Sequence, residues 1–211
     1  MSFAEPTHTS PVPGNFVPGG FVFVVSGPSG AGKGTLVERL LQERPDCIFA
    51  VSSTTRPKRA NETDGVEYRF VTRSEFESQR EQGRFLEWAE VHGQLYGTPL
   101  LEVETHVRHG RVVVLDIDVQ GGANVRRLRP DSVGVFVTPP SLEALRKRLK
   151  LRATDTPEVI EQRMQNAPGE LAEYVNYDYL IVNDDREKAV AALIAVHDAE
   201  RARINRLILE R

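Results

Sequence analysis

A glycine-rich turn between an apolar run and a helical pattern is the feature that most constrains how this chain folds. Residues 21–25 are β-branched or aromatic, and residues 27–35 read Gly-Pro-Ser-Gly-Ala-Gly-Lys-Gly-Thr. A strand, this turn and a helix over residues 33–43 together predict a phosphate-binding loop. Glycines let backbone N–H groups converge on an anion, and the positive end of the following helix faces the same point.

We therefore expect the turn to hold the phosphates of a nucleoside triphosphate, with Lys33 near the β- and γ-phosphates. Loops of this kind usually carry Ser or Thr directly after the lysine, as a Mg²⁺ ligand. Here Gly34 stands at that position and Thr35 follows. Magnesium is then expected to be held through water and phosphate oxygens. The predicted loop residues are Gly27, Pro28, Ser29, Gly30, Ala31, Gly32, Lys33, Gly34 and Thr35.

Composition limits the remaining choices. The 211 residues carry a net charge of −3, which argues against a protein that coats nucleic acid, and no apolar stretch is long enough to cross a membrane. A single cysteine, Cys47, excludes an intrachain disulfide and fits a reducing cytoplasm. The proline-rich residues 1–18 are expected to be a disordered leader. The five histidines, at positions 8, 92, 106, 109 and 197, lack the spacing of metal ligands in sequence.

The rest of the chain alternates between strand and helix patterns. Strands are expected at residues 48–51, 68–71, 83–89, 112–116, 132–137 and 179–182. Helices are expected to begin at Ser74, at Thr98–Pro99, at Ser141 and at Thr156, and one long helix is expected from Glu187 to the C-terminus. This alternation predicts an α/β fold with a mostly parallel sheet flanked by helices. Residues 52–110 are too long for a simple crossover and are interpreted as a substrate-binding insertion.

Two further groups of residues suggest ligand chemistry. Arg56 and Arg59 lie three residues apart beside hydroxyl groups, and paired guanidinium groups suit a second phosphate, although a solvated basic loop would look the same. Asp116 and Asp118 end an apolar strand at the edge where open α/β sheets bind ligands. Their alternative role is to cap nearby backbone N–H groups.

Five stretches in fixed order give the chain a resemblance to the guanylate kinase family. They are residues 51–59, 65–70, 85–89, 96–98 and 115–121, which read Val-Ser-Ser-Thr-Thr-Arg-Pro-Lys-Arg, Gly-Val-Glu-Tyr-Arg-Phe, Phe-Leu-Glu-Trp-Ala, Tyr-Gly-Thr and Leu-Asp-Ile-Asp-Val-Gln-Gly. Together with the phosphate loop, this similarity extends over about residues 20 to 211.

The resemblance implies an ATP:GMP phosphotransferase of purine nucleotide metabolism that uses Mg²⁺, with dGMP as a further acceptor left open. It implies a guanylate kinase-like domain over residues 19–211. The domain would comprise a core (19–51, 111–140 and 177–211), a GMP-binding insertion (52–110) and a lid (141–176).

The same resemblance implies roles for individual residues. The GMP phosphate would be held by Arg56, Arg59, Tyr68 and Tyr96, and the guanine by Ser52, Glu87, Thr98 and Asp118. Asn183 would lie near the adenine, and Asp116 would act on Mg²⁺ through water. The catalytic cations would be Lys33, Arg148, Arg152 and Arg163.

Elementary chemistry agrees with the base site. Guanine presents N1–H and N2–H₂ donors on one edge, so a carboxylate such as Glu87 is complementary to it, whereas adenine would leave the carboxylate unpaired. Two alternatives remain: a kinase of another small phosphorylated acceptor, and a protein-binding module on the same fold. The intact Gly32-Lys33 and the lid arginines argue against the binding module. The sequence is compatible with a monomer and with a homo-oligomer.

Overall fold

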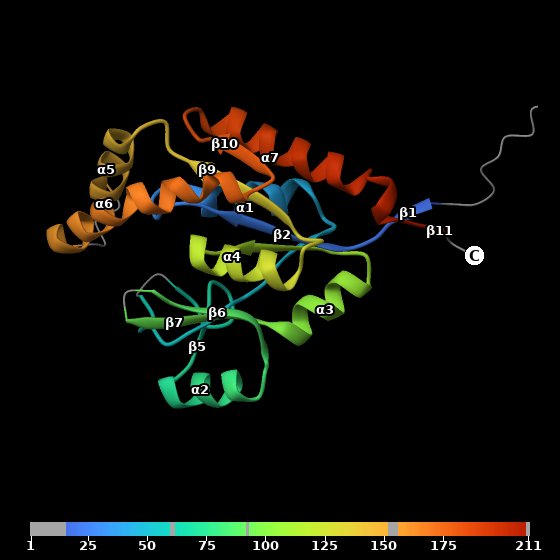
Figure 1. The fold of residues 1–211 in the computed structure, drawn as a ribbon, viewed down its shortest axis with the longest axis horizontal. Coiled ribbons are helices and arrows are strands. Elements are labelled where there is room, and N and C mark those ends of the chain that lie inside the picture. Colours follow the sequence, from blue (N-terminus) through green and yellow to red (C-terminus); the bar gives the residue numbers. More distant parts are fainter. Residues whose placement is uncertain (1–15, 60–61, 92, 152–155, 210–211) are drawn as a thin grey trace, which may run out of the picture.

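The chain is built on a parallel five-stranded sheet, seen in a computed structural model that describes residues 16–59, 62–91, 93–151 and 156–209 (Figure 1). The strand order is β10–β9–β2–β8–β3, so the strand before the phosphate loop lies in the middle. The bounds are β2 (Phe21–Ser26), β3 (Cys47–Phe49), β8 (Val112–Asp116), β9 (Val133–Thr138) and β10 (Tyr179–Val182). The predicted α/β class with a mostly parallel sheet is confirmed.

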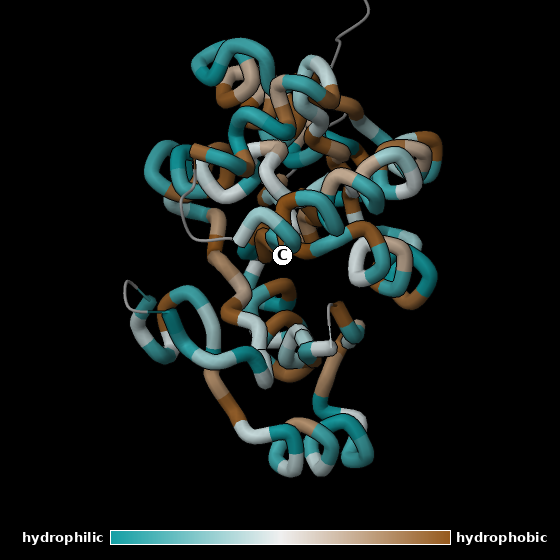
Figure 2. Tube along the Cα trace, turned by 90° about the vertical axis from the view of Figure 1, so that its left-hand side faces the viewer, coloured by the Kyte–Doolittle hydropathy of each residue, from teal (hydrophilic) through white to brown (hydrophobic). Residues whose placement is uncertain are grey.

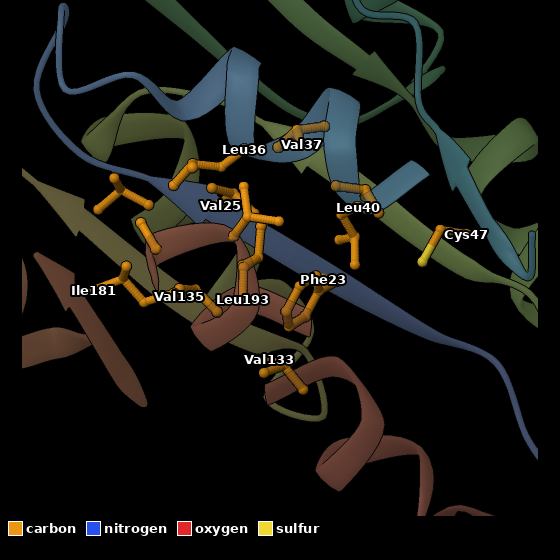
Figure 3. Close-up of a cluster of buried hydrophobic side chains, with 14 of the residues drawn as sticks. Phe23, Val25, Leu36, Val37, Leu40, Cys47, Val133, Val135, Ile181 and Leu193 are labelled. Atoms are coloured by element: carbon orange, nitrogen blue, oxygen red, sulfur yellow. The ribbon is translucent and has the colours of Figure 1, made fainter. Parts of the chain in front are cut away.

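Helices cover both faces of this sheet, which explains why its central strand is apolar at almost every position. All six residues of β2 are buried. One face packs on α1 (Lys33–Glu43) and α7 (Arg186–Arg201), where Phe23 and Val25 meet Leu36, Leu40 and Leu193 (Figure 3). The other face packs on α3 (Leu100–Arg108) and α4 (Val119–Leu128).

A second sheet lies below the first in Figure 1 and comes entirely from the predicted insertion. Its order is β5–β4–β7–β6, with β4 (Ser53–Thr54), β5 (Arg69–Phe70), β6 (Phe85–Val91) and β7 (Gln94–Pro99). Helix α2 (Arg73–Glu81) packs on it through Phe76, whose ring stacks on Phe85 at 4.5 Å between centroids. The stacked rings therefore join α2 to this sheet.

Helices α5 (Leu142–Leu151) and α6 (Pro157–Ala172) form a third element, to the left in Figure 1, followed by the 3₁₀ turn η1 (Glu173–Asn176). They pack on each other around Leu145, Leu149, Ile160 and Met164. As predicted, Thr156 caps α6 by accepting a hydrogen bond from the N–H of Val159. The helix pair is the segment that the sequence assigned to a lid.

Two helix starts differ from the expectation. Thr72, not Ser74, caps α2, because Thr72 and Glu75 form a reciprocal capping box. Helix α3 begins at Leu100, and Pro99 is still the last residue of β7, since the pairing of β6 with β7 extends to that position.

The chain ends also differ from the expectation. Helix α7 stops at Arg201 and does not reach the C-terminus; the turn η2 (Ile204–Arg206) and strand β11 (Leu207–Leu209) follow. Arg203 and Arg206 both contact the buried Glu200, which draws the chain back over the helix end. Strand β11 pairs with β1 (Phe16–Pro18), so residues 16–18 of the expected leader are a strand. Residues 1–15 lie outside the described part of the chain.

Figure 2 shows hydrophilic and hydrophobic residues alternating along the helices, as expected for helices that bury one face. Within the described residues, none of the helices combines the length and the apolar character that crossing a bilayer requires.

Candidate active site

The phosphate loop leaves β2 at the carboxyl edge of the sheet and ends at the open N-terminus of α1. Gly27 has φ of 137°, and a Cβ there would lie 2.1 Å from the carbonyl oxygen of Val137, so only glycine fits. Gly32, with φ of 95°, precedes α1 without a side-chain cap. The first N–H groups of the helix are therefore oriented toward an anion.

Lys33 and Asp116 lie together at this edge. The Lys33 ammonium donates to the carbonyl of Gly27 at 2.8 Å and stands 4.0 Å from Oδ1 of Asp116. A Cβ on Gly34 would be 3.5 Å from Oδ2 of Asp116, so the missing side chain at that position leaves room beside the carboxylate. Carboxylate and water oxygens are the ligands Mg²⁺ prefers, and Asp116 with this open space fits an ion held together with a triphosphate.

Two predicted arginines from the α5–α6 pair reach the loop. Arg148 donates to the carbonyls of Ala31 at 3.1 Å and Asn183 at 2.6 Å, and Arg163 donates to the hydroxyl of Ser29. The Asn183 amide also donates to the Ala31 carbonyl, at 2.8 Å. The fold thus brings two arginines of the predicted lid onto the phosphate loop from more than a hundred residues away. The predicted Arg152 lies outside the described residues.

One cavity of about 510 Å³ joins the phosphate loop to the second sheet. From the loop side it is lined by Ser29, Lys33 and Gly34, with Asp116 and Arg163. Seven predicted acceptor-site residues also line it, namely Ser52, Arg56, Arg59, Tyr68, Glu87, Tyr96 and Asp118. A cavity of this size suits small molecules rather than a macromolecular surface.

The predicted second phosphate site contains a residue that the sequence reasoning missed. Both oxygens of Glu62 accept from the Arg56 guanidinium, at 2.7 and 3.1 Å, and one also accepts from the Arg59 N–H at 2.8 Å. The Glu62 side chain is only 8% exposed. Its burial opposes ionisation, yet hydrogen bonds from Arg56 and Arg59 hold its pKa below the usual value. The position of Glu62, three residues after Arg59, was the available signal in the sequence.

Aromatic rings complete this site. The Arg56 guanidinium lies over the Tyr68 ring at 5.5 Å from its centroid, and the Tyr68 and Tyr96 rings meet edge to face at 5.8 Å. Burial raises the pKa of Tyr68 to about 12, so its hydroxyl remains a hydrogen-bond donor at neutral pH. The arrangement offers cations and hydroxyl donors to a single anion.

The predicted base site is a chain of three polar side chains. The Thr98 hydroxyl donates to Glu87 at 2.7 Å and lies 3.4 Å from the Ser52 hydroxyl. Glu87 is 5% exposed, and burial, with a contribution from Asp118, raises its pKa to about 7. The buried Glu87 carboxylate accepts a hydrogen bond from Thr98 and can accept more, which favours a ligand that brings N–H donors.

Asp118 has the capping role that the sequence left open as an alternative. Its Oδ1 accepts from the Gly121 N–H at 2.7 Å, which makes Asp118 the N-cap of α4. It nevertheless lines the cavity, and its charge acts on Glu87. Capping and a place in the base site are therefore compatible.

A phosphate loop at the carboxyl edge of a parallel sheet, facing a second cationic site across one cavity, defines a kinase of the P-loop class that phosphorylates a small anionic acceptor. Within that class the chain belongs to the guanylate kinase family of nucleoside monophosphate kinases. The family model described as guanylate kinase matches residues 21–200.

Individual relatives agree with the family model. The guanylate kinase of Symbiobacterium thermophilum is 52% identical over 186 residues, covering 88% of each chain. That of Myxococcus xanthus is 47% identical over 192 residues, covering 90% of this chain and 92% of its own. The crystal structure of guanylate kinase from Anaplasma phagocytophilum superposes with a TM-score of 0.78 at 32% identity, over 92% of this chain and 93% of that one.

Proposed function

We propose that this chain transfers the γ-phosphoryl group of ATP to GMP, producing ADP and GDP. The observation that carries the proposal is that one cavity is lined by Lys33 of the phosphate loop and also by Arg56 and Glu87 of the predicted acceptor site. A reaction between two phosphates needs both anions held in one space, where positioning and electrostatics supply most of the rate.

On the donor side, the loop N–H groups and Lys33 would hold the ATP phosphates, and Asn183 would lie near the adenine. Arg148 and Arg163, which already contact the loop, would stabilise charge on the transferring group, together with Arg152. Mg²⁺ bound with ATP would neutralise the β- and γ-phosphates. Asp116 would orient the water around it, because Gly34 offers no hydroxyl.

On the acceptor side, Arg56, Arg59, Tyr68 and Tyr96 would bind the GMP phosphate. The Glu87 carboxylate would accept from guanine N1–H and N2–H₂, with Ser52, Thr98 and Asp118 around it. The acceptor phosphate is already anionic near neutral pH, so the reaction needs no general base.

The three structural parts correspond to the proposed division of labour. Residues 19–51, 111–140 and 177–211 would form the ATP-binding core, residues 52–110 the GMP domain, and residues 141–176 a lid. Closing the lid and GMP domain would bring the two phosphates together and expel water that would otherwise hydrolyse ATP. Nucleotide substrates and one buried, unpaired cysteine support a cytoplasmic location.

The test is ADP release in a coupled assay with Mg²⁺–ATP and GMP, dGMP, AMP, UMP, CMP or ribose phosphates. Turnover restricted to GMP and dGMP supports both the reaction and guanine recognition at Glu87. Turnover with another acceptor would keep the kinase and overturn the base site. ATP binding without turnover on any acceptor would favour a binding module.

A further inference from the structure

Three potential metal ligands gather at the edge of the sheet opposite the nucleotide cavity. Asp46 and Cys47 lie at the start of β3, and His197 comes from the end of α7, which packs against the sheet. One donor atom from each residue lies within 4.8 Å of the other two. Cys47 stands at the border of the core cluster in Figure 3, and it and His197 are buried, whereas Asp46 is 27% exposed and gives access from solvent.

The two ring nitrogens of His197 contact different carboxylates, and Nε2 is the one that faces Asp46. Nδ1 lies 2.9 Å from Oδ1 of Asp198, and Nε2 lies 3.2 Å from Oδ2 of Asp46. Asp198 is itself bound by the Arg44 guanidinium at 2.7 and 2.6 Å, which lowers its pKa to about 2 and keeps it an acceptor.

A neutral imidazole can donate from one nitrogen only. In the tautomer whose Nδ1–H donates to Asp198, the Nε2 lone pair faces Oδ2 of Asp46. A carboxylate that holds the far nitrogen of a histidine is the usual outer partner of a metal-binding imidazole. In this tautomer Nε2 of His197 and Oδ2 of Asp46 are both acceptors, and a metal ion between them would be bound by both.

We propose that Asp46, Cys47 and His197 bind a thiophilic divalent cation such as Zn²⁺. Sulfur, imidazole nitrogen and carboxylate oxygen are the donors that zinc prefers, and a water molecule would complete the tetrahedron. Two tetrahedral zinc ligands of nitrogen and oxygen stand about 3.4 Å apart. The 3.2 Å between Nε2 and Oδ2 is close to that separation.

Nearby cations limit the affinity of this site. Arg201 lies 3.0 Å from Oδ2 of Asp46, and Arg111 donates to the Asp46 carbonyl at 3.1 Å. Burial raises the pKa of the Cys47 thiol to about 12, so binding releases a proton from sulfur to solvent. The metal must share Asp46 with Arg201. We therefore expect exchangeable binding, weaker than that of a structural zinc centre with four charged or imidazole ligands.

The ligand atoms of this site also prefer a different metal from the site proposed for Mg²⁺. Magnesium prefers oxygen ligands and keeps its water, so it competes poorly for sulfur and nitrogen. Occupancy of the Asp46–Cys47–His197 site would tie the end of α7 to the start of β3, and the ion would add to folded-state stability by mass action.

The single cysteine of the chain makes a direct experiment possible. The full-length protein, kept reduced with a phosphine, is titrated with Cd²⁺ in excess Mg²⁺ while the ultraviolet thiolate-to-cadmium charge-transfer band is followed. Because any such band must come from Cys47, we expect a saturable signal at one equivalent that Zn²⁺ displaces. Zn²⁺ should also raise the Tm of the wild-type protein.

Variants test the other two ligands. Cys47→Ser should abolish the band, and Asp46→Asn and His197→Asn should each weaken Cd²⁺ binding at least tenfold. His106→Asn, on helix α3, changes a histidine that is not one of the three proposed ligands; it is the control and should bind as the wild type does. Far-ultraviolet circular dichroism checks that each variant is folded. If His197→Asn fails to fold, Asp46→Asn alone decides the result.

Two outcomes would overturn the proposal. One is the absence of a saturable band in the wild-type protein. The other is a band whose midpoint is the same in the folded Asp46→Asn and His197→Asn variants as in the wild type, because the thiol would then bind the metal by itself.

Discussion

At the scale of single residues, the site depends on carboxylates whose surroundings differ sharply. Glu87 is buried with one threonine donor, so its pKa rises to about 7, whereas Glu62 is buried against guanidinium groups and its pKa falls. Burial alone disfavours the charge in both cases, and the nearby cations decide the difference. A glutamate can therefore be an acceptor for a ligand, as we propose for Glu87, or the charged partner of an arginine, as Glu62 is for Arg56.

The raised pKa of Glu87 predicts how GMP use depends on pH. The guanine edge needs a carboxylate acceptor, so the KM for GMP should rise up to tenfold per pH unit below pH 7, as the carboxyl becomes protonated. The effect of Glu87 on the stability of the ligand-free protein has the opposite pH dependence. Its pKa in the folded state lies above the usual 4.5, so the protonated group favours the folded state at low pH, and this contribution is lost as pH rises through 7.

Steady-state kinetics between pH 5.5 and 8 measure this effect, with Glu87→Gln as the comparison. Gln keeps one acceptor and lacks the charge, so we expect the KM for GMP to rise roughly ten- to a hundredfold at pH 8. Its pH dependence should shrink to that of the GMP phosphate itself, with a pKa of about 6. An identical pH profile in both proteins would remove Glu87 from the base site.

Glu62 is expected to orient Arg56 for the acceptor phosphate. Glu62→Gln replaces a charged partner of the Arg56 fork by a neutral one and should raise the KM for GMP about tenfold, since a charge-assisted hydrogen bond contributes about 1.5–3 kcal/mol. The kcat and the KM for ATP should stay within about twofold, because the change weakens binding of the acceptor alone.

Glu77→Gln is the matched control, because Glu77 also accepts from an arginine, Arg73, at 3.4 Å, but lies on helix α2 and not in the lining of the cavity. Its KM for GMP should remain near the wild-type value. A lower KM in Glu62→Gln would contradict the orienting role and would mean that the carboxylate competes with the phosphate.

At the scale of elements, the bounds of a helix or strand are predicted well where a single sequence pattern marks both of its ends. The helix over residues 33–43, the strand over 112–116 and the strand over 179–182 were predicted with the observed bounds, because each has a clear apolar pattern next to turn residues. The predicted start of α2 was wrong, because the hydroxyl groups of Thr72 and Ser74 can both cap the N-terminus of a helix. Each of these two residues is also followed three residues later by a glutamate, Glu75 or Glu77, so the sequence permits a capping box at either position, and the structure forms it at Thr72.

This competition gives a stability prediction for α2. Thr72→Ala removes the cap and should lower the free energy of unfolding by about 1 kcal/mol, or roughly 2–4 °C in Tm for a chain of this size. Ser74→Ala, at the cap position that the sequence suggested, should change Tm by less than 1 °C, about the size of an ordinary surface substitution. Thermal unfolding followed by circular dichroism compares the two, and equal losses would refute the assigned cap.

At the scale of the whole molecule, contacts between distant segments set both the ends of the chain and the site. Strand β1 pairs with β11, and the carbonyl of Arg206 accepts from the Gly19 N–H at 2.6 Å. Arg201 also donates to the carbonyls of Pro18, Gly19 and Gly110. The β1–β11 pairing and these hydrogen bonds therefore connect residues 16–19 to residues 201–209.

Two truncations test that arrangement. Deleting residues 2–15 should leave both Tm and kcat/KM unchanged, because the described contacts begin at Phe16. Deleting residues 2–18 also removes β1 and should lower Tm by several degrees while the nucleotide cavity keeps its lining residues. A large loss of kcat/KM in the shorter deletion would show that the leader takes part in the reaction.

The sequence by itself determined the phosphate loop, the alternation that makes an α/β sheet, and the candidate residues of both phosphate sites. These follow from short-range rules of strand, turn and helix formation together with motifs in a fixed order. Only the tertiary structure decided that Arg148 and Arg163 contact the loop, that Glu62 binds Arg56, and that Asp46, Cys47 and His197 meet. Those contacts join segments that are separate in the sequence or lie in an irregular loop, so no local periodicity encodes them, and they appear only when the sheet order and helix packing bring the side chains together.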